Sequence, residues 1–264
     1  MRMRTLGGTG IKVSPYCLGA MMFGAWGNPD HEDSIRIIHA ALDGGINFVD
    51  TADVYSAGES EEIVGQALRG RRDDVVLATK AHSSMGKDPN MSGNSRRWLV
   101  REVENSLRRL QTDYIDLYQM HRPDPDTDID ETLSALSDLI AAGKIRRLPH
   151  RFDPSRPGNQ AKLAAVEELI KIAADAGCSL IHLALAFVTA HQGVTSAIIG
   201  PRTMDQLTDL LAGAAVTLDD EVLDRIDQIV PPGMTLNPAD AGWQPPALTD
   251  PIARRRPRAA RAVV

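Results

Sequence analysis

Strand-like apolar runs alternate with helical patterns along this chain, and that alternation constrains the fold more than any other feature of the sequence. The strand-like runs are short, at Tyr16–Gly19, Ile46–Asp50, Val75–Thr79, Ile115–Tyr118 and Ser196–Ile199. Apolar residues recur at the helical period in the segments that follow the first four runs, at His31–Leu42, Glu59–Leu68, Ser95–Leu110 and Asp128–Ala142. This order is typical of βαβ units in a parallel sheet, and such units in series predict an α/β fold of the (β/α)8 TIM barrel type.

The sequence predicts a single domain over residues 1–264, in three parts. Residues 1–16 are predicted to form a polar β-hairpin that caps the barrel, because the turn Gly7-Gly8-Thr9-Gly10 separates two short strands. Residues 17–230 form the barrel itself, with further helices at Gln160–Ala176, Leu180–Ala190, Met204–Leu211 and Asp220–Ile229. Residues 231–264 are rich in Pro, Gly and Arg and are predicted to be a C-terminal loop with a basic tail.

The alternation breaks after Arg146. Lys144-Ile145-Arg146 should open a fifth strand, but the following run, Arg147–Gly158, is dominated by prolines, arginines and a histidine. Proline cannot donate to a strand ladder, so this run does not make a buried parallel strand. The sequence therefore predicts about five good strands and one stub where a complete barrel needs eight strands, so that much of strands 5–7 is lacking.

Charge is distributed unevenly along the 264 residues. The net charge is −6, and five arginines without an acid lie in the last eleven residues, at Arg254, Arg255, Arg256, Arg258 and Arg261. Removing those five positive charges from −6 leaves −11 on the rest of the chain. An acidic body argues against a nucleic-acid-binding surface. The basic tail could meet phosphate or a membrane surface, but a solvated terminus is the favoured interpretation.

Cysteine usage and hydropathy indicate a soluble, cytoplasmic protein. Cys17 and Cys178 provide neither a disulfide framework nor a metal-ligand spacing, which favours a reducing compartment and no bound metal. The N-terminus has no apolar signal region. Leu180–Ala190, the longest apolar candidate, is too short to span a membrane and contains His182, so no membrane partner is predicted.

Ionisable side chains stand where the strand-like runs end. Asp50 ends one run, Lys80 directly follows Val75–Thr79, and His121 directly follows Tyr114–Met120, which contains the Ile115–Tyr118 run. Tyr55 comes five residues after Asp50. In a barrel these strand ends converge on one face, which would assemble a proton-transfer site. Taken singly, each has an ordinary explanation as a turn former, a packing residue, a solvated lysine or a loop histidine. Taken as a set of four, they favour the proton-transfer interpretation.

The motifs around these residues resemble those of the aldo-keto reductase superfamily, in the bacterial branch that is also similar to potassium-channel β-subunits. The resemblance covers nearly all of residues 1–250. It is carried by five motifs in the family's order, namely Leu18–Gly24, Phe48–Tyr55, Ala78–Lys80, Asp113–His121 and Ile199–Arg202 with Gln206. No G-x-G-x-x-G fingerprint is present, which argues against a Rossmann dehydrogenase.

This resemblance implies NADPH-dependent reduction of a small aldehyde or ketone to the alcohol. Hydride addition to the carbonyl carbon builds negative charge on oxygen, and a proton must arrive there. Tyr55 is expected to be the general acid, and Lys80 to favour its phenolate. Asp50 would pair with Lys80, and His121 would orient the substrate oxygen.

The resemblance also implies residues that hold the cofactor and line the substrate pocket. Gly200, Pro201 and Arg202 would bind the adenosine phosphate, with Gln206 facing the adenine and Met22 lining the cofactor site. The family often has an asparagine where this chain has Leu210. Phe23, Trp26 and Trp243 are expected to line the substrate pocket. A surface arginine, a helix-face glutamine and tryptophans that pin loops are the structural alternatives.

The resemblance places the break in the middle of the cofactor site. The family's strand-five Ser-Asn pair, its strand-six glutamine and its Ser-Pro-Leu loop do not follow Arg146. Three βα units amount to roughly 80–90 residues. Either the protein carries an internal deletion between Arg146 and Arg147, or a segment of the natural protein is missing from this sequence. The second is favoured, because a direct join would leave a strand edge open.

Two rival functions follow from the break. One is a non-catalytic NADP(H)-binding or regulatory barrel, and the other is an inactive truncated form. The substrate, the physiological direction and the oligomeric state, including a homo-oligomer, are left open.

Overall fold

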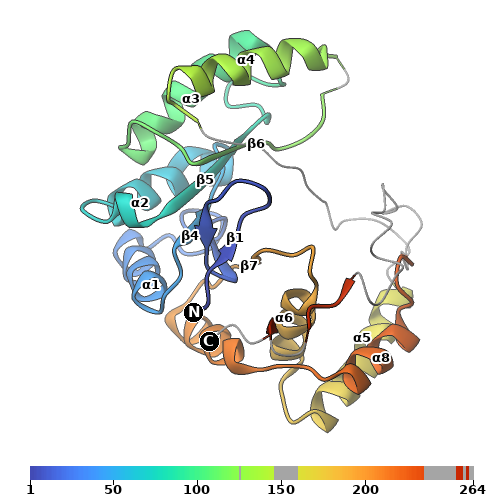
Figure 1. Ribbon diagram of the computed structural model, residues 1–264. Coiled ribbons are helices and arrows are strands. Elements are labelled where there is room, and N and C mark those ends of the chain that lie inside the picture. Colours follow the sequence, from blue (N-terminus) through green and yellow to red (C-terminus); the bar gives the residue numbers. More distant parts are fainter. Residues whose placement is uncertain (125, 146–159, 235–253, 258–259, 262–264) are drawn as a thin grey trace. The chain divides into compact units, whose positions relative to one another are not determined.

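The computed structural model describes residues 1–124, 126–145, 160–234, 254–257 and 260–261 (Figure 1). The chain divides into two compact units. The sheet unit consists of Tyr16–Phe152 and Ile198–Leu207, and the helical unit consists of Met1–Pro15, Asp153–Ala197 and Thr208–Val264. The single domain over 1–264 stays a prediction.

The sheet unit is built on a five-stranded sheet with the order β6-β5-β4-β3-β7 (Figure 1). Its strands are β3 (Tyr16–Gly19), β4 (Phe48–Asp50), β5 (Val76–Ala81), β6 (Leu117–Met120) and β7 (Ala197–Ile199). The pairs β3–β4, β4–β5 and β5–β6 are parallel. Their strand residues are almost all buried, as expected for a parallel sheet that is covered by helices on its faces. The predicted parallel α/β architecture is therefore confirmed.

Four helices follow the strands of this unit. They are α1 (His31–Asp43), α2 (Glu59–Ala67), α3 (Arg96–Leu110) and α4 (Ile129–Ala141), with short 3-10 turns η1 (Tyr55–Gly58) and η2 (Arg72–Asp74). Side chains cap three of them at the N-terminus, since Asp30, Ser95 and Asp128 each accept a hydrogen bond from a backbone amide of the first turn. Helix α3 buries Leu99, Val103, Leu107 and Leu110, the face that the helical period of the sequence predicts, and it also buries Trp98.

Within the described ranges, the predicted fifth strand is reduced to a single bridge residue, Ile145. Ile145 forms a parallel bridge with Ile115, and the Ile115 amide donates to the Lys144 carbonyl at 2.9 Å. The stub therefore lies beside β6, where a fifth strand would continue the sheet. Among the described residues the sheet has β6 and β7 as its edges, and its closure into a barrel is not seen. Arg147–Gly158 lies outside the described residues.

The helical unit contains the predicted N-terminal hairpin and a separate helical core. Strands β1 (Arg4–Thr5) and β2 (Lys12–Val13) pair antiparallel. The unit contains α5 (Gln160–Asp175), α6 (Leu180–Ala190), the end of α7 (Met204–Ala212), η3 (Gly213–Ala215) and α8 (Asp220–Ile229). Helix α5 packs against α6 and α8, and the core between them includes Ile172, Leu183, Leu223 and Ile226.

The basic tail is not a solvated terminus in its described part, so that expectation was wrong. Arg254 and Arg261 are each only 5% exposed. Arg254 pairs with Asp227 at 2.5 Å, and Arg261 pairs with Asp220 at 2.7 Å. Helix α8 has acids at spacings that bring them to one face, and these acids compensate the arginine charges, so burial of the arginines becomes tolerable.

No single helix in the described ranges is long and apolar enough to cross a membrane. Helices α5 and α6 pass that test only as a pair, over Ala165–Asp175 and Leu180–Ala190, with a bend of 92° between them. Cys17 and Cys178 are both free thiols.

Candidate active site

The sheet brings the predicted proton-transfer residues to one edge. Asp50 is the last residue of β4, Lys80 is the next-to-last residue of β5, and His121 directly follows β6. Tyr55 opens η1, the turn that follows β4. Because β4, β5 and β6 are parallel neighbours, their carboxyl ends lie side by side, which is where ligands bind in α/β sheets.

Lys80 is the centre of the group. Its Nζ donates to Asp50 Oδ1, to the Thr51 carbonyl at 2.8 Å and to Tyr55 Oη at 3.3 Å. Asp50 and Lys80 are only 5% and 6% exposed. A buried ammonium needs a paired charge and good acceptors, and this site provides both. The structure therefore brings Asp50, Lys80 and Tyr55 into direct contact.

The pairing keeps Lys80 charged. Burial alone would lower the pKa of Lys80, but the Asp50 carboxylate and then Tyr55 outweigh it, so the pKa is raised above its ordinary value. Lys80 is consequently an ammonium at neutral pH and presents a fixed positive charge to the Tyr55 hydroxyl.

His121 lies against the ring of Tyr55 from the neighbouring strand end. The two ring centroids are 5.7 Å apart with an interplanar angle of 81°. Burial, and then the nearby Lys80 charge, lower the pKa of His121 to about 4. Its Nδ1 is buried and has no hydrogen-bond partner among the described residues. His121 is therefore a neutral imidazole at neutral pH.

Gln119 also belongs to the group, although no role for it was predicted from the sequence. Its Nε2 donates to Asp50 Oδ2 at 2.7 Å, so both Asp50 oxygens are occupied. The register pairs Gln119 with Lys80 on the adjacent strand. Two signals pointed to it: a buried Asp50 carboxylate needs a second donor, and Gln119 shares a strand face with His121 at the two-residue period.

The turn after Tyr55 has an unusual backbone. Ser56, Ala57 and Gly58 have φ values of 49°, 56° and 101°, all in the left-handed region. Non-glycine residues there cost about 1–2 kcal/mol each, so such a turn persists only when its surroundings hold it. Part of that support is the loop after β3, because the Trp26 amide donates to Ser56 Oγ at 3.1 Å and the Ala25 amide donates to Glu59 Oε2 at 2.7 Å.

The predicted pocket residues after β3 have different environments. The Trp26 ring lies 6.1 Å from the Tyr55 ring, centroid to centroid, and is 53% exposed. Phe23 is fully buried and Met22 is half-buried. Trp243 lies outside the described residues. Trp26 is thus the aromatic side chain that the structure brings beside Tyr55 at the surface.

The predicted phosphate-binding residues follow β7. The Arg202 side chain is exposed, and its guanidinium makes no hydrogen bond or ion pair with any residue in the described ranges. Gln206 Oε1 accepts from the Arg202 amide at 2.7 Å, and the Gln206 amide donates to Thr203 Oγ1 at 3.3 Å. Gln206 therefore orders the start of α7 as a helix cap does. Asn28 Nδ2 also donates to the Arg202 carbonyl at 3.2 Å.

This loop fits an anionic phosphate. A free guanidinium offers a planar fork of donors, and the loop leads directly into the N-terminus of α7, where phosphates bind readily. A Cβ added to the exposed Gly200 would meet no atom within 4 Å, so a ligand could approach its backbone.

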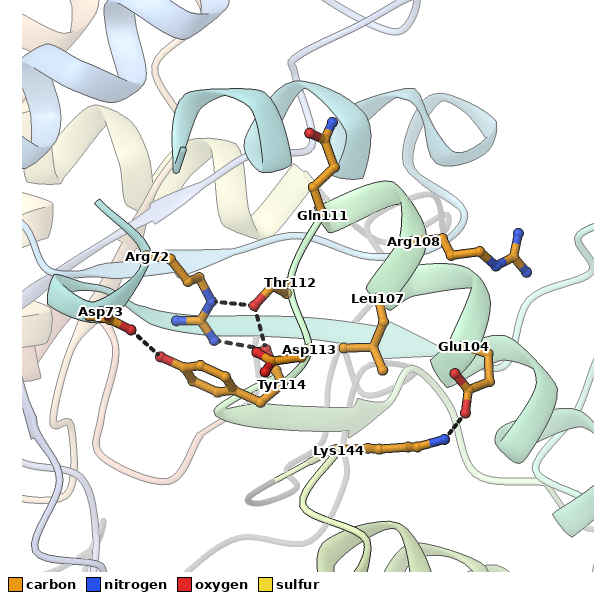
Figure 2. A pocket seen from close by; sticks show the side chains of 10 residues that line it. All are labelled: Arg72, Asp73, Glu104, Leu107, Arg108, Gln111, Thr112, Asp113, Tyr114 and Lys144. Carbon is orange, nitrogen blue, oxygen red and sulfur yellow. Dashed lines mark hydrogen bonds and ion pairs between the residues drawn. The ribbon is translucent and has the colours of Figure 1, made fainter. Parts of the chain in front are cut away.

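A second polar cluster lies at the opposite ends of the strands. An open groove of about 680 Å³ is lined by residues that precede β5 and β6, among them Arg72 and Tyr114 (Figure 2). Arg72 donates to Thr112 Oγ1 at 3.1 Å and to the Tyr114 carbonyl at 2.9 Å, and it pairs with Asp116 at 2.8 Å. Through these contacts Arg72 links the turn that precedes β5 to the turn that precedes β6.

Comparison with known proteins gives a family match in two parts. The model of the Aldo/keto reductase family matches residues 15–149 and 147–231. The aldo-keto reductase YhdN of Bacillus subtilis is 47% identical over 152 residues, which cover 56% of this chain and 46% of YhdN. A probable voltage-gated potassium channel subunit beta of Arabidopsis thaliana is 41% identical over 150 residues, which cover 54% of this chain and 44% of that protein. The chain thus spans about half the length of these two curated relatives.

Two further matches extend along most of both chains. The uncharacterized oxidoreductase YrpG of Bacillus subtilis is 31% identical over 312 positions, which cover 86% of this chain and 95% of YrpG. Because 312 positions exceed the 264 residues of this chain, YrpG has residues without a counterpart here. The holo form of aldo-keto reductase AKR11C1 from Bacillus halodurans superposes with a TM-score of 0.71 at 28% identity, covering 87% of this chain and 96% of that one.

Proposed function

The chain belongs to the aldo/keto reductase family, and from that premise we propose that it reduces a small aldehyde or ketone to the alcohol with NADPH as the hydride donor. The observation that carries the proposal is the buried Lys80, which pairs with Asp50 and donates to the Tyr55 hydroxyl at 3.3 Å. A buried lysine that is paired with a carboxylate acts through its positive charge on the other group that it contacts. Here that group is the Tyr55 hydroxyl.

Each residue of the site has a separate part in delivering the proton to the carbonyl oxygen. Bound NADPH supplies the hydride, and negative charge then develops on the carbonyl oxygen. Tyr55 donates the proton that this oxygen needs. A free tyrosine has a pKa of about 10 and donates reluctantly at neutral pH. The Lys80 ammonium favours the phenolate that remains, and Asp50 together with Gln119 keeps Lys80 in place.

His121 orients the substrate in this proposal. A neutral imidazole carries one N–H, which can donate to the carbonyl oxygen and bring it to the Tyr55 hydroxyl. Because the ring is neutral, it holds the oxygen without competing with Tyr55 as a proton source. Phe23, Trp26 and Trp243 are proposed to line the substrate pocket, with Trp26 supported by its position beside the Tyr55 ring.

The cofactor is proposed to bind through Gly200, Pro201, Arg202, Gln206 and Met22. Arg202 favours NADPH over NADH, because its guanidinium suits the additional phosphate on the adenosine ribose. The free guanidinium of Arg202 and the N-terminus of α7 support this assignment.

We also propose that the natural protein is a complete (β/α)8 barrel in a single domain and is cytoplasmic. The stub at Ile145 beside β6 and the surplus positions of YrpG support additional βα units after this point.

Replacement of Tyr55 by phenylalanine tests the mechanism. Turnover is expected to fall by about 10²–10⁴-fold, because a positioned general acid contributes on that scale, while NADPH affinity changes by less than about twofold. The rate is followed as loss of NADPH absorbance with a panel of aldehydes, and binding as quenching of intrinsic fluorescence.

Tyr114→Phe is the matched control. The Tyr114 hydroxyl donates to Asp73 at 3.3 Å in the groove at the other ends of the strands (Figure 2). This variant is expected to keep full turnover. Aldehyde reduction retained in the Tyr55→Phe variant would exclude Tyr55 as the acid.

The match to plant potassium channel β-subunits supports a second candidate, a non-catalytic NADP(H)-binding or regulatory protein. The same assays separate the two. A wild-type protein that binds NADPH but oxidises it with no aldehyde or ketone would support the regulatory candidate.

A further inference from the structure

Buried carboxylates gather around one guanidinium beside the turn that carries Tyr55. Asp53, Glu61 and Glu102 are all fully buried. Arg109, on α3, donates from Nε to Glu61 at 2.6 Å and from Nη2 to Glu102 at 2.5 Å. The proposed chemistry uses none of these four residues. The burial of three carboxyl groups around one guanidinium requires a reason, because ionisable groups are costly in a protein interior unless they are paired.

Glu61 and Glu102 are fixed on both of their oxygens. Thr79 Oγ1 donates to the second oxygen of Glu61 at 2.6 Å, and Asn105 Nδ2 donates to the second oxygen of Glu102 at 2.7 Å. Glu61 lies on α2, Thr79 on β5 and Glu102 on α3. Arg109 thus connects the strand that contains Lys80 to the two helices beside it.

The side chain of Arg109 also lies against the turn that follows Tyr55. A Cβ added to Gly58 would be 2.8 Å from Arg109 Cδ and 3.2 Å from its Nε. Gly58 ends the left-handed run that begins at Ser56. Arg109 therefore occupies the space that the turn would need in order to relax.

The cluster also includes Asp53, which lies two residues before Tyr55. Asp53 accepts from the Val54 amide at 2.6 Å, and its own amide donates to the Lys80 carbonyl at 3.0 Å. Burial, and then the neighbouring Glu61 and Glu102, raise the pKa of Asp53 well above its ordinary value. The Tyr55 backbone is thus held from Asp53 on one side and from Gly58 on the other.

We propose that Arg109 is a positioning residue for the reduction: by holding Glu61 and Glu102 with its guanidinium and Gly58 with its stem, it fixes the turn that sets Tyr55 Oη 3.3 Å from Lys80 Nζ. The inference rests on the proposed function, because it needs Tyr55 as the acid. Loss of Arg109 leaves two buried carboxylates without their cation and lets the left-handed run relax, so Tyr55 moves relative to Lys80.

Arg109→Met tests the inference against Arg72→Met. Both arginines lie in the sheet unit, pair with buried carboxylates and are similarly covered, with side chains 18% and 14% exposed. Arg72 lies at the opposite ends of the strands (Figure 2). Both variants are expected to lower the melting temperature. Only Arg109→Met is expected to lower kcat, by about 10–100-fold, the loss that a displacement of about 1 Å produces.

The readout separates positioning from general destabilisation. Rates are measured well below both melting temperatures, and KM and the NADPH Kd are expected to stay within about twofold, since Arg109 contacts neither ligand site. Arg109→Lys restores the charge and most of the stem but cannot bridge two carboxylates, so its kcat should lie between those of wild type and Arg109→Met.

Gly58→Ala provides an independent test that keeps every charge. Its methyl group would meet Arg109 at 2.8 Å, and φ is 101° there. Gly143→Ala is the control, because φ is 75° but the added methyl group would have no atom of a described residue within 4 Å. Gly58→Ala is expected to lower kcat as Arg109→Met does, and Gly143→Ala to leave it unchanged.

Two results would overturn the inference in distinguishable ways. If wild type is active and both Arg109→Met and Gly58→Ala keep the kcat of their controls, Arg109 is only structural. If wild type reduces no carbonyl compound, the proposed function fails first, and the positioning role fails with it.

Discussion

Replacing Lys80 with methionine would isolate the buried ion pair on which the proposed chemistry depends. Methionine keeps the length of the side chain and removes its charge. The ammonium donates to Asp50, to the Thr51 carbonyl and to Tyr55 Oη, and all of this lies in a region that solvent barely reaches. Among the described side chains, Gln119 would then be the donor that Asp50 keeps. Removing one partner of a buried pair costs about 3–5 kcal/mol.

The contribution of the Lys80–Asp50 pair to the free energy of unfolding should depend on pH in a defined direction. The penalty in the variant comes from a buried carboxylate without its cation. In wild type the folded-state pKa of Lys80 is raised above 10.5. The stability that the pair contributes is therefore fully present at pH 7 and is lost only as the pH rises through that raised pKa.

Urea unfolding at pH 7, followed by circular dichroism and by tryptophan fluorescence, would measure the effect. With m-values of about 1–3 kcal/mol/M, a loss of about 3–5 kcal/mol should lower the midpoint by roughly 1–5 M at pH 7. The double variant Lys80→Met/Asp50→Asn removes both charges and should regain most of the lost stability. A loss below about 1 kcal/mol, or a double variant no more stable than the single one, would refute the reasoning.

Two further predictions follow from features described above. The pKa of His121 is lowered to about 4 by burial and then by Lys80, so the imidazole C2–H resonance should titrate with a midpoint near pH 4. The folded state should lose stability as the pH falls below the ordinary histidine value toward 4, and a midpoint near 6.5 would contradict this. The protein isolated from its natural source should exceed 28.6 kDa by roughly 9 kDa, as three units of about 30 residues imply; an intact mass at 28.6 kDa would instead establish a true internal deletion.

The sequence predicted those parts of the fold that local pattern determines. Strand β3 and helices α6 and α8 have the predicted limits, because apolar runs, a Ser179 cap and an Asp219 cap define them within a few residues. The strand ends carrying Asp50, Lys80 and His121 were also found, since an ionisable residue that ends an apolar run is a local signal.

The sequence did not reveal interactions between charges that are distant in the chain. Glu61 and Arg109 lie 48 residues apart, and in the sequence each looks like an ordinary solvent-facing charge on an amphipathic helix. The tail arginines were misjudged for the same reason, because Asp227, the acid that pairs with Arg254, is on α8. Such pairs become visible only when tertiary packing has removed both charges from water.

The position of β7 has a consequence for synthesis of the protein. Strands β3 to β6 are neighbours in the order in which they are made, but β7, made last, lies beside β3, made first. In this 264-residue chain roughly 180 residues separate these two strands, a distance that the additional βα units proposed above would lengthen, and a ribosome adds about 5–20 residues per second. The edge of β3 therefore waits on the order of 10–40 s for its partner, and during that time it can pair with another nascent chain. Slower translation after α4 should increase aggregation of the newly made protein, whereas early binding of a chaperone should protect it.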